Sequence, residues 1–116
     1  MTDVRTTYLH AIDVAVELVD DAALDARFDT PSALEEYTCG ALAGHLLRSL
    51  LTVDTYLDDA AHDDPARVGP PPDLDAPTYF ARALDGHDPR TSYVHVSVRS
   101  RSAELAGPDV TSLRAR

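Results

Sequence analysis

The chain has 116 residues, a formal net charge of −10 and an isoelectric point of about 4.6. This length allows one domain with one core, and an apolar content of 44% is typical of a folded protein. An acidic surface repels phosphate backbones and anionic lipid surfaces. The composition therefore excludes unaided binding to nucleic acid and disfavours binding to membrane surfaces.

The cysteine content and the distribution of apolar residues indicate the cellular compartment of the protein. A single cysteine, Cys39, rules out an internal disulfide, as is typical of a reducing cytosol. The N-terminus lacks the cationic and apolar regions of a signal peptide, and no run reaches the roughly 18 apolar residues of a membrane span. The sequence therefore predicts a cytoplasmic protein.

An amphipathic helix is predicted over residues 3–26, with Thr2 as its N-cap. Its apolar side chains recur at helical spacing and share one face. They are Val4, Tyr8, Ile12, Ala15, Val19 and Ala22. Pro31 prevents this helix from running on, so residues 27–37 are expected to form a connection. We expect Phe28 and Tyr37 to hold that connection to the core.

A second helix is predicted over about 39–58, with Thr38 as its cap. The apolar stripe of this helix comprises Leu42, Leu46, Ser49, Leu50, Val53 and Leu57. Gly40 and Gly44, near its start, lower the helix propensity. Small residues of this kind are usually kept where a neighbouring element must approach closely.

The second half of the chain reads as a crossover followed by further helices. Residues 58–77 are acidic and proline-rich, which predicts an extended, exposed segment. A short helix over roughly 77–85 and a turn at 86–89 follow. Residues 91–106 fit a strand or a helix, and we expect a helix because no second strand is predicted for pairing. One more helical turn is expected over 109–116, after a break at Gly107 and Pro108.

The predicted fold class is therefore all-α, with a single helical-bundle domain over residues 1–116. Three main helices are expected, one fewer than a four-helix bundle requires.

His45 is the strongest candidate for a functional residue. It lies at the edge of the apolar stripe of the second predicted helix, and neutral imidazole in a helical bundle is a common ligand of zinc or nickel. The alternative is a partly buried histidine that is hydrogen-bonded to a neighbour, because a metal site needs three or four ligands and this face offers one. The remaining histidines are predicted to be solvated. They are His10, His62, His87 and His95.

Cys39 is a second candidate, because a helix N-terminus can lower the pKa of a thiol and make it reactive. The alternative is a small, buried apolar residue. Nucleophile elbows, phosphate-binding loops and dinucleotide-binding loops are absent from the sequence, so no catalytic residue is predicted.

One stretch resembles a known family. Residues 28–48 carry an aromatic residue, then Pro-Ser-x-Leu-x-x-Tyr-Thr, then a helix with Leu-x-x-His-Leu. This pattern resembles the metal-binding N-terminal domain of mycothiol-dependent maleylpyruvate isomerases, which belongs to the DinB-like superfamily. The matching residues are Pro31, Ser32, Leu34, Tyr37, Thr38, Leu42, His45 and Leu46. Residues 51–57 and 94–106 are also similar to this family, whereas Phe28 stands where relatives often have Trp.

The resemblance implies a DinB-like up-down four-helix bundle that binds one divalent metal, usually zinc, with His45 as the first ligand. In relatives this metal activates a small-molecule thiol, mycothiol, for isomerisation or S-transfer. The other ligands of the family lie on a last helix that has no counterpart in this sequence. The resemblance therefore leads us to expect a metal-binding domain that is inactive or incomplete as a single chain.

Two other functions stay open. A non-catalytic helical interaction or dimerisation module is the first, because three helices of a bundle leave an apolar groove uncovered. On this ground we expect a homodimer or another homo-oligomer. A reactive-thiol protein that uses Cys39 is the second.

Overall fold

The structure, a computed structural model, describes residues 3–62 and 73–116. Its helices are α1 (Val4–Asp20), α2 (Ala22–Arg27), α3 (Cys39–His62), α4 (Ala76–Leu84), α5 (Tyr93–Ala106) and α6 (Val110–Arg114). These ranges contain no strand, apart from a single antiparallel bridge between Pro31 and Thr38. The all-α prediction is confirmed, including the helix over 91–106, and the DinB-like bundle stays a prediction.

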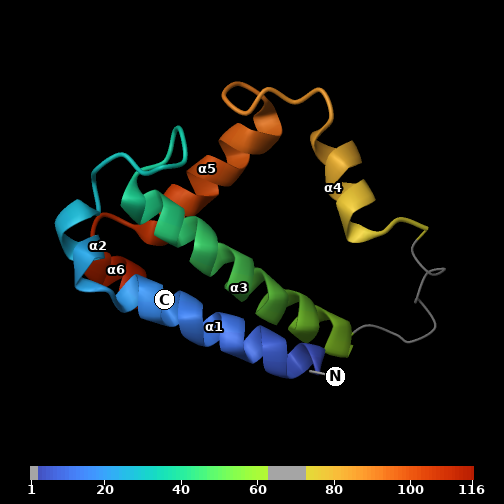
Figure 1. The fold of residues 1–116 in the computed structure, drawn as a ribbon, viewed down its shortest axis with the longest axis horizontal. Coiled ribbons are helices and arrows are strands. Elements are labelled where there is room, and N and C mark those ends of the chain that lie inside the picture. Colours follow the sequence, from blue (N-terminus) through green and yellow to red (C-terminus); the bar gives the residue numbers. More distant parts are fainter. Residues whose placement is uncertain (1–2, 63–72) are drawn as a thin grey trace.

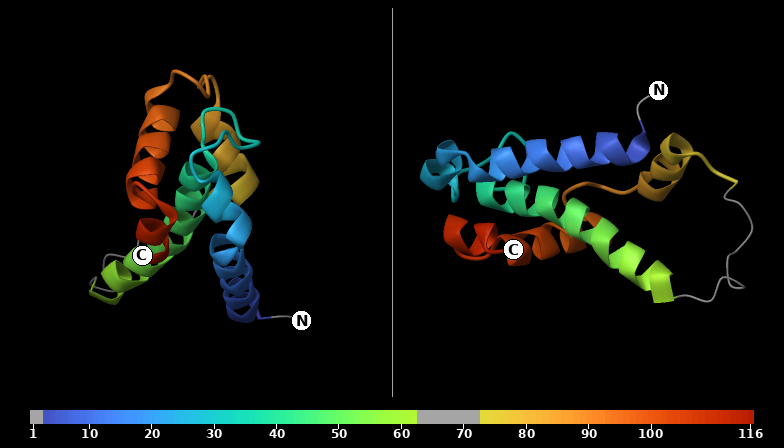
Figure 2. Two further views of the ribbon diagram at one scale, coloured as in Figure 1. Left: turned by 90° about the vertical axis from the view of Figure 1, so that its left-hand side faces the viewer. Right: turned by 90° about the horizontal axis from the view of Figure 1, so that it is seen from below.

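The helix α3 lies in the middle of the molecule, with α1 on one side and α5 on the other (Figures 1 and 2). Helices α1 and α3 run antiparallel, and α5 makes its most extensive contact with α3. Helix α4 stands apart from the other helices, at the opposite end of the molecule from α2. None of the helices in the described ranges combines the length and the apolar character needed to cross a membrane.

The predicted helix over 3–26 is wrong in one respect, because Asp21 breaks it. The backbone of Asp21 is extended, with φ −63° and ψ 131°, and its carboxylate accepts a hydrogen bond from the Ala23 N–H at 2.7 Å. Aspartate competes with helical hydrogen bonding in this way and favours N-cap positions. A new helix, α2, therefore begins after Asp21. The N-cap of α1 is Asp3, and Thr2 lies outside the described residues.

The connection between α2 and α3 supplies the partners that the start of α3 needs. The carbonyl oxygens of Thr30 and Phe28 accept hydrogen bonds from the N–H groups of Cys39 and Gly40, both at 2.8 Å. The Thr38 hydroxyl accepts from the Ala41 N–H at 3.1 Å, so the predicted cap is confirmed. These contacts satisfy N–H groups that a helix start leaves unpaired.

Helix α3 is longer than predicted, because it continues to His62. The expected extended segment is therefore wrong for residues 58–62, and residues 63–72 lie outside the described part of the chain. No Gly or Pro occurs between residues 45 and 62 to end the helix earlier. A ring nitrogen of His62 lies 2.8 Å from the Asp58 carbonyl oxygen, and histidine is favoured in a last helical turn.

Helices α3 and α5 approach most closely at Gly44. A Cβ atom at this position would lie 2.3 Å from the Ser102 carbonyl oxygen and 3.0 Å from the Ala106 Cβ. A Cβ on Gly40 would lie 2.7 Å from the Phe28 ring. Both glycines therefore sit where a neighbour packs against the helix backbone, as the sequence predicted.

A small core joins the ends of the main helices. Its buried members are Val19, Phe28, Ala106 and Leu113, and partly buried Leu24, Ala43, Leu47 and Val110 pack against them. Each of the main helices and the short α6 contributes to this cluster, so burial is concentrated near the α1–α2 junction and the start of α3.

The C-terminal helix α6 fastens this core. Gly107 adopts φ 72° and ends α5, and Asp109 caps α6 by accepting from the Ser112 N–H at 2.8 Å. This hydrogen bond lowers the pKa of Asp109 below its ordinary value.

Arg114 in α6 ties the C-terminus to the break between α1 and α2. Its guanidinium donates to the carbonyl oxygen of Val19 at 2.9 Å, to that of Asp21 at 3.1 Å and to the Asp25 carboxylate at 3.0 Å. The carbonyl groups at a helix end lack partners within the helix. Arg114 therefore stabilises the α1–α2 break that the sequence did not predict.

The substitution Gly44→Ala is expected to lower the free energy of unfolding by about 1–3 kcal/mol, because its Cβ forces α3 and α5 apart. In an exposed helix the same change raises the free energy of unfolding by roughly 1 kcal/mol. The sign of the measured change therefore decides whether α5 packs against residue 44. Urea unfolding followed by circular dichroism measures it. Ser49→Ala, on the exposed side of α3, is the control and should change stability by less than about 0.5 kcal/mol. A Gly44→Ala protein as stable as the parent would contradict the close approach.

Candidate functional site

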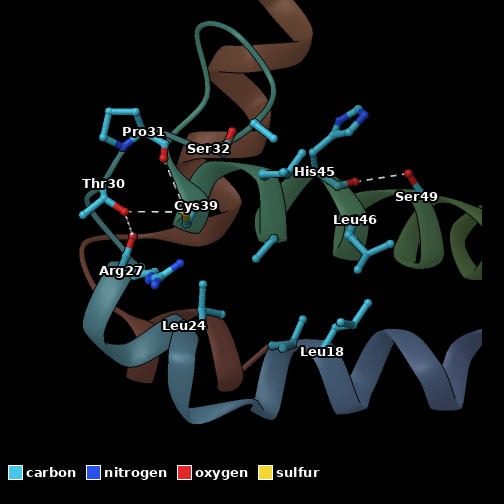
Figure 3. Close-up of a pocket in the computed structure, with 14 residues that line it drawn as sticks. Leu18, Leu24, Arg27, Thr30, Pro31, Ser32, Cys39, His45, Leu46 and Ser49 are labelled. Atoms are coloured by element: carbon cyan, nitrogen blue, oxygen red, sulfur yellow. Dashed lines mark hydrogen bonds between the residues drawn. The ribbon is translucent and has the colours of Figure 1, made fainter.

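A groove of about 730 Å³ lies between α3 and the α1–α2 pair (Figure 3). We call it the α1–α3 groove. It is lined by Leu18, Val19, Leu24, Arg27, Thr30, Pro31, Ser32, Ala33, Cys39, Leu42, Ala43, His45, Leu46 and Ser49. Most of these side chains are apolar, and the volume is within the roughly 300–1,000 Å³ of small-molecule sites.

The apolar floor of the groove comes from both walls. In Figure 3 the Leu46 side chain extends from α3 toward Leu18 of α1. The Leu18 residue is nevertheless 60% exposed, because nothing in the described chain packs over it. Arg27, Cys39 and Ser49 add polar groups to the lining. The groove therefore combines an uncovered apolar surface with polar groups that can orient a bound partner.

The groove belongs to a wider pattern of uncovered apolar side chains. Within the described residues the buried apolar core consists of Ala15, Val19, Phe28, Ala106 and Leu113. Large apolar side chains elsewhere in the described ranges are exposed as well, for example Leu57 at 64% and Tyr56 at 67%. Much apolar surface of these ranges is therefore uncovered.

His45 is half-buried and is held by α5. Its Nδ1 atom lies 3.2 Å from the Ser102 hydroxyl oxygen, and its ring centroid is 5.7 Å from that of Tyr37. The ring points away from α1, on the other side of α3 from Leu46 (Figure 3). This is the hydrogen-bonded histidine that the sequence left open as the alternative, and the metal role of His45 stays a prediction.

The partner of Ser102 fixes the tautomer of His45. Ser102 is fully buried, and its hydroxyl donates to the Val98 carbonyl oxygen at 2.7 Å. A hydroxyl has one proton, so the Ser102 oxygen must accept the hydrogen bond from His45. The His45 ring then carries its proton on Nδ1 and a lone pair on Nε2. A ring nitrogen with a free lone pair can accept a proton or bind a metal.

The described residues do not complete a metal site around His45. In the ranges 3–62 and 73–116, no three His, Cys, Asp or Glu side chains are grouped closely enough to hold a metal. A metal bound at His45 would therefore need its other ligands from beyond these residues. His10, His62 and His87 are exposed, as predicted, whereas His95 is half-buried.

Cys39 is the first residue of α3 and is half-buried in the lining of the groove (Figure 3). Its Sγ atom lies 3.6 Å from the Thr30 hydroxyl oxygen and 3.8 Å from the Pro31 carbonyl oxygen. These are weak hydrogen bonds of a thiol group. The structure therefore places Cys39 in the groove and His45 at its edge, with the imidazole ring of His45 turned away from α1.

Sequence reasoning missed Ser102 and Leu18. Ser102 lies within residues 94–106, which resemble the family, but the resemblance assigned it no role. Gly44 predicted a close neighbour but not its identity. Leu18 lies outside the predicted apolar stripe of α1, so its place in the groove was not predicted. Both roles depend on how separate helices pack together.

Comparison of the chain with protein-family models, with curated proteins and with solved structures found no match. The DinB-like resemblance therefore stays a prediction from the sequence.

The substitution Ser102→Ala is expected to release the His45 tautomer, because Nδ1–H loses its acceptor. Nitrogen NMR of histidine-labelled protein at neutral pH should show a protonated Nδ1 in the parent and a shift toward protonated Nε2 in the variant. Ser100→Ala, two residues away on an exposed position of α5, is the matched control and should leave the His45 signals unchanged. A parent protein with its proton on Nε2 would contradict the assignment.

Proposed function

We propose that this chain is a helical interaction module of the cytoplasm and that the α1–α3 groove is its binding surface. The observation that carries this proposal is the uncovered apolar groove of about 730 Å³ beside a small core. Exposed apolar patches of this kind mark binding sites for proteins or ligands.

The energetics support binding at this surface. Transfer of a leucine side chain from water to an apolar contact is worth about 1.5–3 kcal/mol. Because Leu18 is 60% exposed, its burial by a partner gains more than half of this free energy. The groove also carries Arg27, which gives a positive charge to a site in a chain of net charge −10. A partner with an apolar face and a negative charge therefore fits this surface.

The substitution Leu18→Glu is expected to weaken the binding of anilinonaphthalene sulfonate, an apolar fluorescent probe with a negative charge. The added carboxylate removes apolar surface and repels the sulfonate, so the dissociation constant should rise at least tenfold, or about 1.4 kcal/mol. Fluorescence titration measures the change.

The control for this test is Val16→Glu. Val16 is on the same helix and is 46% exposed, and it is not among the residues that line the groove. Its substitution should change probe affinity less than about twofold. Equal affinity of the parent and the Leu18→Glu protein would refute the groove as the binding surface.

A second proposal follows from the resemblance at residues 28–57. Under this proposal the chain is a DinB-like domain that binds a divalent metal, zinc above all, with His45 as a ligand, and is related to mycothiol-dependent isomerases or S-transferases. The specific support is the Ser102 hydrogen bond, because metal-binding histidines usually donate their other ring N–H to a fixed acceptor. Such a metal needs further ligands beyond the described residues of one chain.

Metal content tests this second proposal. If it is correct, mass spectrometry of protein incubated with zinc and then desalted should find one metal per chain or per two chains. His45→Ala should lose this metal, whereas His87→Ala, an exposed histidine in a turn, should retain it. Equal zinc content in the parent and the His45→Ala protein would rule out a His45 site and leave the interaction module as the one proposal.

A further inference from the structure

Helix α4 is an amphipathic helix with its apolar face uncovered. Tyr79, Phe80 and Leu84 share one face and are 56%, 61% and 45% exposed. Ala83 lies within the same face, and Ala81 lies on the opposite side of the helix. Among the described elements, α4 has no extensive contact with another helix (Figure 1).

A helix of this length needs a partner. Helix α4 has nine residues, and isolated helices shorter than about 12–15 residues are marginal in water. Local features help it to form, because Asp75 accepts a hydrogen bond from the Thr78 N–H at 2.9 Å. Hydrogen bonds from the Thr78 side chain and from its backbone N–H lower the pKa of Asp75. Most of the stability of a short helix in a protein comes from packing of its apolar face. Helix α4 buries no side chain, so burial of its apolar face is the missing contribution.

We propose that α4 of one copy packs into the α1–α3 groove of a second copy, and that the second copy returns the contact. This inference rests on the proposed function and names its partner. Each chain carries one exposed amphipathic helix and one exposed apolar groove, so a two-fold arrangement fills both grooves at once. A short apolar helix in a groove is a recurrent mode of recognition.

Charge complementarity supports this pairing. Arg27 lines the groove and has no ion pair among the described residues. Helix α4 is flanked by Asp75 at its N-cap and Asp85 at its C-cap. One of these carboxylates can pair with Arg27 when the helix enters the groove.

The tether of α4 favours a contact between chains. The Arg99 guanidinium donates to the carbonyl oxygens of Pro89 and Arg90, and Arg90 pairs with Glu35. Only residues 85–88 are left between α4 and this anchored point, and four residues span at most about 14 Å. In Figure 1 helix α4 lies at the other end of the molecule from α2, and α2 forms one end of the groove. The short tether therefore keeps α4 away from the groove of its own chain.

Disulfide trapping tests the proposal, because the native Cys39 lines the groove. The variant Ala83→Cys places a thiol on the apolar face of α4, and Ala81→Cys places one on the opposite face as the matched control. After mild oxidation with oxidised glutathione, Ala83→Cys should give a disulfide-linked species of twice the chain mass, at least fivefold more than Ala81→Cys. The same species should vanish when Cys39→Ser is added.

Three results would overturn the inference: equal linkage from both positions, a disulfide within one chain, or no disulfide at all.

Sedimentation velocity provides a second measurement. The Phe80→Asp protein should show a larger monomer fraction than the parent protein. If Leu18→Glu weakens probe binding and Ala83→Cys gives no linked dimer, the groove has another occupant and the inference alone fails. If Leu18→Glu has no effect, the proposed function itself fails.

Discussion

The approach of α5 to the backbone of α3 at Gly44 is the constraint on which the rest of the structure depends. A side chain at this position would overlap the Ser102 carbonyl group, so the contact exists only because residue 44 is glycine. The approach brings Ser102 to the His45 ring and buries Ala106 against α3. Ala106 in turn joins Leu113 of α6, and Arg114 carries the contact to the end of α1. The packing of the core therefore depends, through this series of contacts, on one glycine.

This arrangement fastens α1 mainly at one end. The Val19 side chain and the Val19 carbonyl group are both held, the first by the core and the second by Arg114. Toward its start, α1 packs on α3 without a covering layer, and Leu9 and Val14 are exposed. The α1–α3 groove is the result, since the packing that would cover Leu18 is not supplied by the described chain. An uncovered apolar surface of this size favours association, which is why the interaction module is the function that the geometry supports best.

The two proposals meet at the edge of the groove, which His45 lines. The His45 ring points away from α1 and is held by Ser102, whereas Leu18 lies on α1 (Figure 3). A substitution at Leu18 therefore tests the groove and leaves the hydrogen bond of His45 in place. A dimer through α4 also brings a second chain to the molecule, and ligands that one chain lacks can come from another. The interaction module and the metal-binding domain are thus compatible.

The sequence alone determined the helical class, the Thr38 cap, the helix over 91–106 and the close packing at Gly40 and Gly44. These features follow from local chemistry, because spacing, capping residues and glycine act within a few positions of the chain. It also offered His45 and Cys39 as candidate functional residues, but not what they contact. Tertiary structure decided the burial of Ser102, the role of Arg114 and the place of Leu18 in the groove. Each of these depends on residues far apart in sequence, such as Arg114 with Val19, and no local pattern specifies which helix face meets which.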